Sequence, residues 1–329
     1  MRIERVADIL ERARGKRILV AGDLMLDEFL WGEVTRISPE APVPVVRVTG
    51  ESSYPGGAAN VARNVHELGG RAGVLGLCGA DDAGSRLIAA LEESGIETAG
   101  CVRRPGTKTI VKTRIVAKHQ QVVRVDREPA RDSDGTLLEE TMAGQIRELV
   151  GAADAIIFSD YAKGFLSQPL VESVMGPAIE QSKIIAVDPS PLNTVRWAGA
   201  TVIKPNRAEA LRAAGLHELS AVNDMLAVGN RLLDEWRARM ILLTLGEEGM
   251  LLFERERPVF HTPTRAREVF DVSGAGDTAI AAFTLALCAG AEPAEAAELA
   301  NTASGIVVGK LGTATASPPE VLAAYEGPQ

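Results

Sequence analysis

Short apolar runs alternate with helical patterns along most of this chain, and no other feature constrains its fold as strongly. Apolar runs with the length of buried strands occupy residues 17–22, 72–77, 155–158, 184–187, 200–203 and 240–245. Patterns with helical spacing lie between them, at residues 58–68, 85–94, 137–150 and 223–237. Strands that alternate with helices predict an α/β fold, with a doubly wound central sheet flanked by helices.

Two segments interrupt this alternation. Residues 28–54 contain β-prone stretches and a proline-rich string, and residues 107–126 have the pattern of two strands joined around His119. No linker or low-complexity tract divides the chain. We therefore expect one domain over residues 1–329, with a small β-sheet lid inserted within residues 28–54 and 107–126.

Charge and composition argue against several classes of protein. The chain has 35 Lys and Arg residues against 44 Asp and Glu residues, a net charge of −9, whereas a general nucleic-acid-binding protein needs a basic surface. The longest apolar run, residues 278–291, is too short to span a bilayer, and residues 1–17 lack the apolar core of a signal peptide. Three scattered cysteines are typical of reduced thiols. We expect a cytoplasmic protein with neither nucleic-acid nor membrane partners.

The strongest local motif lies at residues 271–278, directly before a uniformly apolar helical pattern at residues 279–289. We expect its Gly274, Ala275 and Gly276 at a helix N-terminus, where unpaired backbone N–H groups and the helix dipole attract phosphate oxygens. Asp277 in the same turn can take a proton from a hydroxyl group as a general base. An aspartate that merely caps the helix is the alternative interpretation.

Polar residues near the first strand are further candidates. Asp23 and Asp27 lie at or after its carboxyl end, where open α/β sheets bind ligands. Gly56 and Gly57 precede a helix that carries Asn60 in its first turn. These glycines either let a ligand approach the backbone closely or only form a tight turn.

A second group of candidates follows the later strands. Asn206 and Glu209 share one helix face and can orient magnesium-bound water, or they can form a capping box. Thr244, Gly246 and Gly249 suit nucleotide phosphates or ribose, although many hairpins share this pattern. The P-loop, dinucleotide and nucleophile-elbow motifs are absent from the sequence.

One segment of this acidic chain is strongly basic. Eight Lys and Arg residues and a single acid, Asp126, lie between residues 103 and 127. The strand period of two places Lys112 and Arg114 on the same face. This face is either simply solvated or meets an anionic ligand.

Three motifs occur in order over nearly the full chain: Gly-Gly in the first third, Asn-x-x-Glu in the middle and Asp-x-x-Gly-Ala-Gly-Asp near the C-terminus. Together they resemble the ribokinase-like (PfkB) sugar kinases. The chain is still more similar to one subfamily, the D-glycero-β-D-manno-heptose 7-phosphate kinases. The strings that carry this closer resemblance are residues 22–27, 35–44, 55–60, 120–121, 159–164 and 307–313.

The resemblance implies a ribokinase-like fold and ATP-dependent phosphorylation of O1 of the heptose 7-phosphate to the 1,7-bisphosphate. That reaction is a step toward nucleotide-activated heptose for lipopolysaccharide core or surface glycans. Asp277 would be the base, and residues 274–276 would form the anion hole. The residues that would hold the sugar and its phosphate are Asp23, Asp27, Arg36, Gly56, Gly57, Asn60, Lys112, Arg114 and Lys163. Those that would hold ATP are Asn206, Thr244, Gly246, Gly249 and Asn301.

The resemblance also implies bound ions and a second copy of the chain. Glu209 and Asn206 would arrange Mg²⁺ through water, and Asp271 and Ser273 match the region of a monovalent cation such as K⁺. The lid of this family commonly dimerises, so the resemblance implies a homodimer through the β-lid.

The chain departs from that subfamily at three positions. Ser190, Pro191 and Lys204 stand where the heptose kinases usually carry Lys, Gly and Thr, and all three lie nearer the nucleotide half than the sugar half. The chain ends soon after the kinase motifs, so we expect a kinase without the nucleotidyltransferase that many relatives carry. Two alternatives stay open: another sugar or sugar-phosphate kinase of the same family, and a catalytically silent sugar-phosphate sensor.

Overall fold

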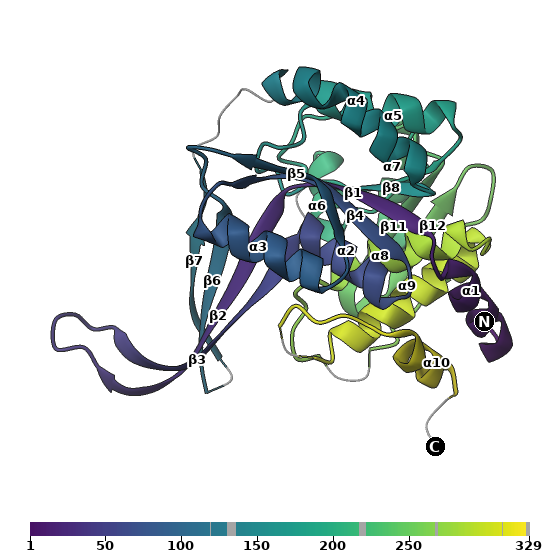
Figure 1. The fold of residues 1–329 in the computed structure, drawn as a ribbon. Helices are drawn as coiled ribbons and strands as arrows, with labels where there is room; N and C mark the ends of the chain where they lie inside the picture. Colours follow the sequence, from purple (N-terminus) through teal and green to yellow (C-terminus); the bar gives the residue numbers. More distant parts are fainter. Residues whose placement is uncertain (119, 130–135, 217–221, 267–268, 311, 327–329) are drawn as a thin grey trace.

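A nine-stranded sheet forms the centre of the protein in this computed structural model (Figure 1). Its strands lie in the order β13 (Phe260–Thr262), β12 (Met250–Glu254), β11 (Met240–Thr244), β10 (Val202–Ile203), β9 (Ile184–Asp188), β8 (Ala155–Ser159), β1 (Arg17–Gly22), β4 (Arg71–Gly79) and β5 (Glu97–Arg104). Pairing is parallel from β11 to β5, and β12 and β13 extend the sheet antiparallel. The structure describes all residues except 119, 130–135, 217–221, 267–268, 311 and 327–329.

Helices cover both faces of this sheet. One face is covered by α1 (Ile3–Ala13), α2 (Ala58–Glu67), α3 (Asp82–Glu93), α8 (Ala275–Cys288), α9 (Pro293–Val307) and α10 (Pro318–Glu326). The other face is covered by α4 (Thr136–Ala152), α5 (Gln168–Glu180), α6 (Arg207–Ala213) and α7 (Val222–Glu235). Because successive side chains of a strand point to opposite faces, Ile18 and Val20 of β1 pack in the first core, and Leu19 and Ala21 pack in the second. The predicted doubly wound α/β fold is confirmed.

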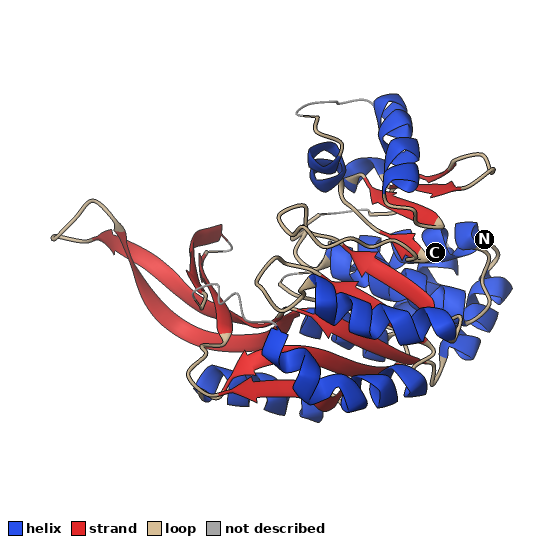
Figure 2. Cartoon of the chain, turned by 90° about the horizontal axis from the view of Figure 1, so that it is seen from above, coloured by secondary structure: helices blue, strands red, loops and turns tan. Residues whose placement is uncertain are grey.

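Four further strands form a second, small sheet in the order β3 (Pro44–Gly57), β2 (Leu24–Ile37), β6 (Ile110–Ala117) and β7 (Gln120–Arg127). Strands β2 and β6 pair parallel, and the two outer pairs are antiparallel. The hairpin of β2 and β3 projects well beyond the rest of the molecule (Figures 1 and 2). These strands include most of the two segments that interrupt the sequence alternation.

Polar residues meet at the carboxyl ends of the parallel strands. Gly22 at the end of β1 pairs with Ser159 of β8, and Ser159 pairs with Asp188 of β9. The residues that follow β1 and β8 therefore lie beside the end of β9. Strand order also reverses between β1 and β8, since β4 and β5 continue the sheet in one direction and β9 to β11 in the other. Open α/β sheets bind ligands at such a switch point.

Two elements differ in extent from the sequence prediction. Helix α8 begins at Ala275, four residues before residue 279, because Gly274 adopts a left-handed φ of +81° that ends the preceding loop within the motif. Strand β10 contains only Val202 and Ile203, whereas an apolar run at 200–203 predicted four residues. The N–H of Ala200 donates instead to the carbonyl of Trp197 and closes a turn. Within the described residues, no helix has both the length and the apolar character needed to cross a bilayer.

Candidate active site

Asp277 lies in the first turn of α8, and both of its carboxylate oxygens accept hydrogen bonds. Asn60 Nδ2 of α2 donates to Oδ2 at 2.7 Å, and the Tyr161 hydroxyl donates to Oδ1 at 2.8 Å. Asp277 is only 5% exposed. The position before the helix requires glycine, because a Cβ on Gly274 would lie 2.9 Å from Asn60 Nδ2 in addition to the strain of its positive φ.

The pKa of Asp277 is raised to about 7, chiefly by burial and in addition by the carboxylate of Asp188. Hydrogen bonds from Asn60 and Tyr161 and the positive charge of Lys204 act in the opposite direction. A carboxylate with a pKa near neutrality can take up a proton from a hydroxyl group and release it again, as a general base must. The environment of Asp277 thus differs from that of a surface helix cap.

A cavity of about 680 Å³ opens beside Asp277 and has the size of a small-molecule site. It brings together a large part of the residues that the sequence predicted for catalysis and ATP: Asn206, Glu209, Thr244, Gly246, Gly274, Gly276 and Asp277. The N–H groups in the first turn of α8 have no intrahelical acceptor, so this end of the cavity attracts anions.

Lys204 is a charged residue of this cavity that the sequence analysis noted only as a departure from the heptose kinases. It follows β10 directly and is 2% exposed. Its Nζ pairs with Asp188 Oδ1 at 2.9 Å and lies 3.2 Å from the position that a Cβ on Gly276 would take. The pKa of Lys204 is raised by Asp188, Glu209 and Asp277, although its burial, the largest influence, acts to lower it. The ammonium group therefore stays charged against the anion-attracting turn.

Asn206 and Glu209 form the capping box that the sequence left open as one reading. The N–H of Glu209 donates to Asn206 Oδ1 at 2.9 Å, and the N–H of Asn206 donates to Glu209 Oε2 at 2.8 Å. Asn206 also bridges to Thr244 at the end of β11, so both residues are fixed at the cavity. Glu209 keeps its other carboxylate oxygen for a ligand. Among the described residues, no cluster of three or more His, Cys, Asp or Glu side chains is arranged to hold a metal ion.

The carboxylate of Asp23 accepts hydrogen bonds from backbone N–H groups. Its Oδ2 accepts the N–H groups of Tyr161 and Lys163 at 2.9 and 3.1 Å, and its Oδ1 accepts that of Phe165 at 3.2 Å. Burial raises the pKa of Asp23, and these three hydrogen bonds act to lower it. Its carboxylate thus fixes the loop after β8, and its role as an acceptor for sugar hydroxyls stays a prediction.

Asp27, Gly56, Gly57 and Asn60 lie together where the small sheet meets α2. A Cβ on Gly56 would lie 2.2 Å from Asp27 Oδ2, and Gly57 has a φ of +58°, so both positions require glycine. Asn60 Oδ1 is buried and finds no hydrogen-bond donor among the described residues. It is therefore an acceptor available to a ligand hydroxyl next to Asp277.

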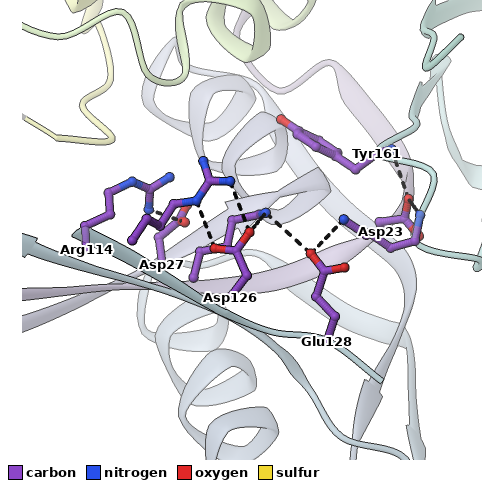
Figure 3. A network of polar contacts seen from close by, with 9 residues as sticks. Asp23, Asp27, Arg114, Asp126, Glu128 and Tyr161 are labelled. Carbon is purple, nitrogen blue, oxygen red and sulfur yellow. Dashed lines mark hydrogen bonds and ion pairs between the residues drawn. The ribbon is translucent and has the colours of Figure 1, made fainter. Parts of the chain in front are cut away.

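Three of the basic residues predicted for the substrate phosphate, Lys112, Arg114 and Lys163, are paired with acids. Arg114 Nη1 contacts Asp27 Oδ1 at 2.5 Å, and Lys112 Nζ lies 3.3 Å from Asp126 Oδ2 and 3.8 Å from Glu128 Oε1. Lys163 contacts the same oxygen of Glu128 at 2.7 Å, and Figure 3 shows this network reaching toward Asp23 and Tyr161. The lysines and acids lie at one edge of the site, where an anion can exchange with the carboxylates.

Five predicted residues lie outside this arrangement. Arg36 is exposed near the end of β2, nine residues and about 30 Å along an extended strand from Asp27. Asn301 does not line the cavity, because its Nδ2 donates to Thr262 Oγ1 and to the carbonyl of Pro263 at 3.0 and 2.6 Å. The other three residues, Gly249, Asp271 and Ser273, take part in local backbone structure. Gly249 forms the β11–β12 turn with a φ of +86°, and Asp271 Oδ1 accepts the N–H of Ser273.

Tyr161, whose hydroxyl donates to Asp277, is a second residue of this site that the sequence analysis did not name as a candidate. It occurs in one of the strings that carry the family resemblance, but no periodicity or spacing connects residue 161 with residue 277. The packing of α8 against β8 and β9 brings the two side chains together.

Comparison with known proteins agrees with this geometry. The sequence profile described as pfkB family carbohydrate kinase matches residues 16–320. Bifunctional protein HldE of Geobacter metallireducens is 45% identical over 325 residues, which cover 98% of this chain and 65% of that protein. The chain therefore spans about two thirds of the length of the curated relatives that it matches.

Solved structures show the same fold. A ribokinase of Arabidopsis thaliana complexed with ribose and ATP has a TM-score of 0.73 at 18% identity and covers 95% of this chain and 100% of its own. Phosphofructokinase-2 of Escherichia coli in complex with potassium has a TM-score of 0.73 at 20% identity, with coverages of 95% and 98%. At these identities the likeness concerns the fold, and the expected ribokinase-like architecture is confirmed.

Proposed function

We propose that this chain, which belongs to the pfkB family of carbohydrate kinases and is therefore an ATP-dependent sugar kinase, phosphorylates O1 of D-glycero-β-D-manno-heptose 7-phosphate. The observation that carries the proposal is the position of Asp277, a buried carboxylate with a pKa of about 7 at the N-terminus of α8, beside a cavity of about 680 Å³. The 45% identity to a protein named HldE and the sequence strings of the heptose kinases support a heptose as the acceptor.

The reaction follows from the groups around Asp277. The O1 hydroxyl of the sugar donates to the carboxylate, which takes its proton as O1 attacks the γ-phosphorus of ATP and the bond to the β-phosphate oxygen breaks. The N–H groups at the start of α8 stabilise the charge on the transferred phosphoryl group. Lys204, whose ammonium lies against Gly276, adds a positive charge at the same place.

Two cations complete the proposed site. Glu209, through the oxygen outside its capping box, and Asn206 would hold water bound to Mg²⁺, which neutralises triphosphate charge when bound. Oxygens of Asp271 and Ser273 would hold a monovalent cation such as K⁺, the ion named with the related phosphofructokinase-2 of Escherichia coli.

The phosphate of the acceptor would be held by the basic residues of the small sheet. Lys112 and Arg114 are each 12% exposed and, with Lys163, they are held by acids in one network. A dianionic phosphate that displaces Glu128 from Lys112 and Lys163 would replace one carboxylate with a stronger acceptor of charge-assisted hydrogen bonds. A kinase of neutral sugars has no need for this arrangement.

A second copy of the chain would cover the small sheet. Apolar side chains are exposed on the β2–β3 hairpin and on β7, among them Ile37, Val43, Val123 and Val125. A homodimer through this sheet would bury them. We expect light scattering to give twice the chain mass for the wild type, and a monomer for the Val123→Lys, Val125→Lys double variant.

The decisive experiment is ADP release with a panel of acceptors. The panel contains the heptose 7-phosphate, the unphosphorylated heptose, fructose 6-phosphate and ribose. We expect at least a hundredfold preference in kcat/KM for the heptose 7-phosphate, with ³¹P NMR showing a new phosphate on O1. A preference for another acceptor would overturn the substrate assignment, and no turnover of any sugar would leave the sugar-phosphate sensor.

A further inference from the structure

Tyr161 donates a hydrogen bond to Asp277, and Asp23 accepts hydrogen bonds from the loop that carries Tyr161. We propose that Tyr161 is a positioning residue of the phosphoryl transfer, whose hydroxyl holds Asp277 in place, and that Asp23 acts by building the loop that presents Tyr161. This proposal rests on the role of Asp277 as the base in the proposed function.

The loop that carries Tyr161 is built around the Asp23 carboxylate. The backbone N–H groups of Tyr161, Lys163 and Phe165 all point to this one side chain, and Figure 3 shows it directly beneath the Tyr161 backbone. Ala162 takes a left-handed φ of +53°, and its N–H donates to Asp160 Oδ1 at 2.8 Å. A residue with a Cβ adopts that conformation at a cost in free energy, so the surrounding hydrogen bonds fix the loop against its intrinsic preference.

The loop holds the Tyr161 hydroxyl against the carboxylate of Asp277. The hydroxyl donates to Oδ1 while Asn60 donates to Oδ2, so both oxygens are fixed and the carboxylate cannot rotate. The remaining acceptor sites of the carboxylate are left for the substrate hydroxyl. Burial and the charge of Asp277 raise the pKa of Tyr161 well above its usual value, so the phenol stays protonated and keeps donating.

Several charged groups surround this contact and remain in place when the hydroxyl is removed. Asp188 at the end of β9 and Lys204 after β10 face Asp277, and Asp188 and Asp27 face Tyr161. Glu209 acts on Lys204. Asn60, Tyr161 and Lys204 favour the ionised form of Asp277, so loss of the Tyr161 hydrogen bond should raise its pKa.

The test is the pH dependence of kcat/KM in Tyr161→Phe, measured by ADP release with ATP and the heptose 7-phosphate. Loss of a hydrogen bond to a carboxylate disfavours its ionised form, so the acidic limb should move upward by about one pH unit. At pH 7 activity should fall about fivefold, because the ionised fraction of Asp277 falls when its pKa rises from about 7 by one unit. Most of the activity should return by pH 9, with the KM for ATP unchanged. Tyr325→Phe is the matched control, because its hydroxyl bonds Thr302 of α9 and no residue of this site.

Asp23→Asn tests the loop. It removes one acceptor oxygen under the loop, so it should move the acidic limb in the same direction as Tyr161→Phe, and the double variant should move it no further. A uniform loss at every pH in Tyr161→Phe, or additive shifts in the double variant, would overturn the proposal.

Failure of the proposed function has different signatures. Wild-type inactivity on the heptose 7-phosphate rejects the substrate, and the titration is then made with the sugar that the panel identifies. Substantial activity in Asp277→Asn rejects the base.

Discussion

The ammonium of Lys204 lies 2.9 Å from the carboxylate of Asp188, and this pair is nearly buried beside the first turn of α8. A lone buried lysine would lose its charge, but Asp188, Glu209 and Asp277 together hold it charged. Four carboxylates line the cavity, those of Asp160, Asp188, Glu209 and Asp277, together with the cations Lys204 and Arg207. Arg207 is paired with Glu248, so loss of Lys204 would leave this excess of carboxylates to repel the nucleotide.

Removal of this charge should affect phosphoryl transfer more than folding. In Lys204→Met we expect kcat with the preferred sugar to fall about 100-fold, the range found when one preorganised donor is lost from a transition state. The melting temperature should also fall, because Asp188 loses its partner. ADP release and thermal denaturation measure the two effects.

A second substitution tests whether charge or shape matters. Ser190 lines the same cavity, so Ser190→Lys in the Lys204→Met background returns an ammonium from another direction and should recover at least tenfold in kcat. Lys183→Met, which removes a lysine that bonds the carbonyls of Gly151 and Ala153, is the control. More than a third of wild-type activity in Lys204→Met would show that the ammonium is only structural.

Asp277 should make stability depend on pH. Its folded-state pKa of about 7 lies above the ordinary value of 3.8, so protonation favours the folded state. The stability that this proton gives is fully present below pH 3.8 and is lost as pH rises through 7. Asp277→Asn carries no charge at any pH, and at pH 8 its free energy of unfolding should therefore exceed that of the wild type by an amount on the order of a few kcal/mol, seen as a higher melting temperature.

The difference between the two proteins should shrink toward pH 4, where both side chains are neutral. In Asp277→Asn the Asn60 amide can rotate, and its Oδ1 can then accept a hydrogen bond from the new NH₂ group. This Oδ1 has no partner among the described residues of the wild type. Equal melting temperatures at pH 8 would mean that Asp277 is not held at a raised pKa. The same variant should lose nearly all kinase activity.

The fold was predictable because local patterns determine it. Buried parallel strands such as β1 and β8 are continuous apolar runs, and the motif around Gly274 contains glycine where the backbone needs a positive φ. The extent of β10 was not predictable from its apolar run, since the turn at Trp197 and Ala200 decides where pairing starts. The start of α8 was misplaced for a similar reason, because Ala275 and Gly276 have no apolar pattern.

The site was predictable only in part, because partners far apart in sequence determine what each side chain does. Asp23 was recognised as a carboxylate at a strand end, but the sequence does not show that three backbone N–H groups use both its oxygens. Lys204 was visible only as an unusual residue. Arg36 belongs to the string at residues 35–44, one of those that carry the resemblance to the heptose kinases. In the structure it lies near the far end of β2, away from Asp27 of the same chain.

Glu209 separates a metal role from a capping role. Glutamine still accepts the Asn206 N–H, so Glu209→Gln keeps the capping box and removes only the charge. If Glu209 arranges Mg²⁺, the variant should need at least fivefold more Mg²⁺ for half-maximal rate and turn over more slowly. A magnesium titration of ADP release measures this. An unchanged titration curve and rate would leave only the helix cap.

The last prediction concerns the ion pairs of Glu128 with Lys112 and Lys163. Removal of a lysine and removal of the glutamate should change the KM for the heptose 7-phosphate in opposite directions. Lys112→Ala removes a cation from the proposed phosphate site and should raise the KM for the heptose 7-phosphate tenfold or more, since a charge-assisted hydrogen bond contributes about 1.5–3 kcal/mol. Glu128→Gln removes the acid that competes with the phosphate for Lys112 and Lys163, so it should lower that KM. Arg124→Ala is the control, since this more exposed residue pairs with Asp126 and, among the described residues, not with Glu128. Neither substitution should alter the KM for ATP, and the unphosphorylated heptose should bind poorly to every variant. Equal changes for phosphorylated and unphosphorylated sugar would place the phosphate elsewhere.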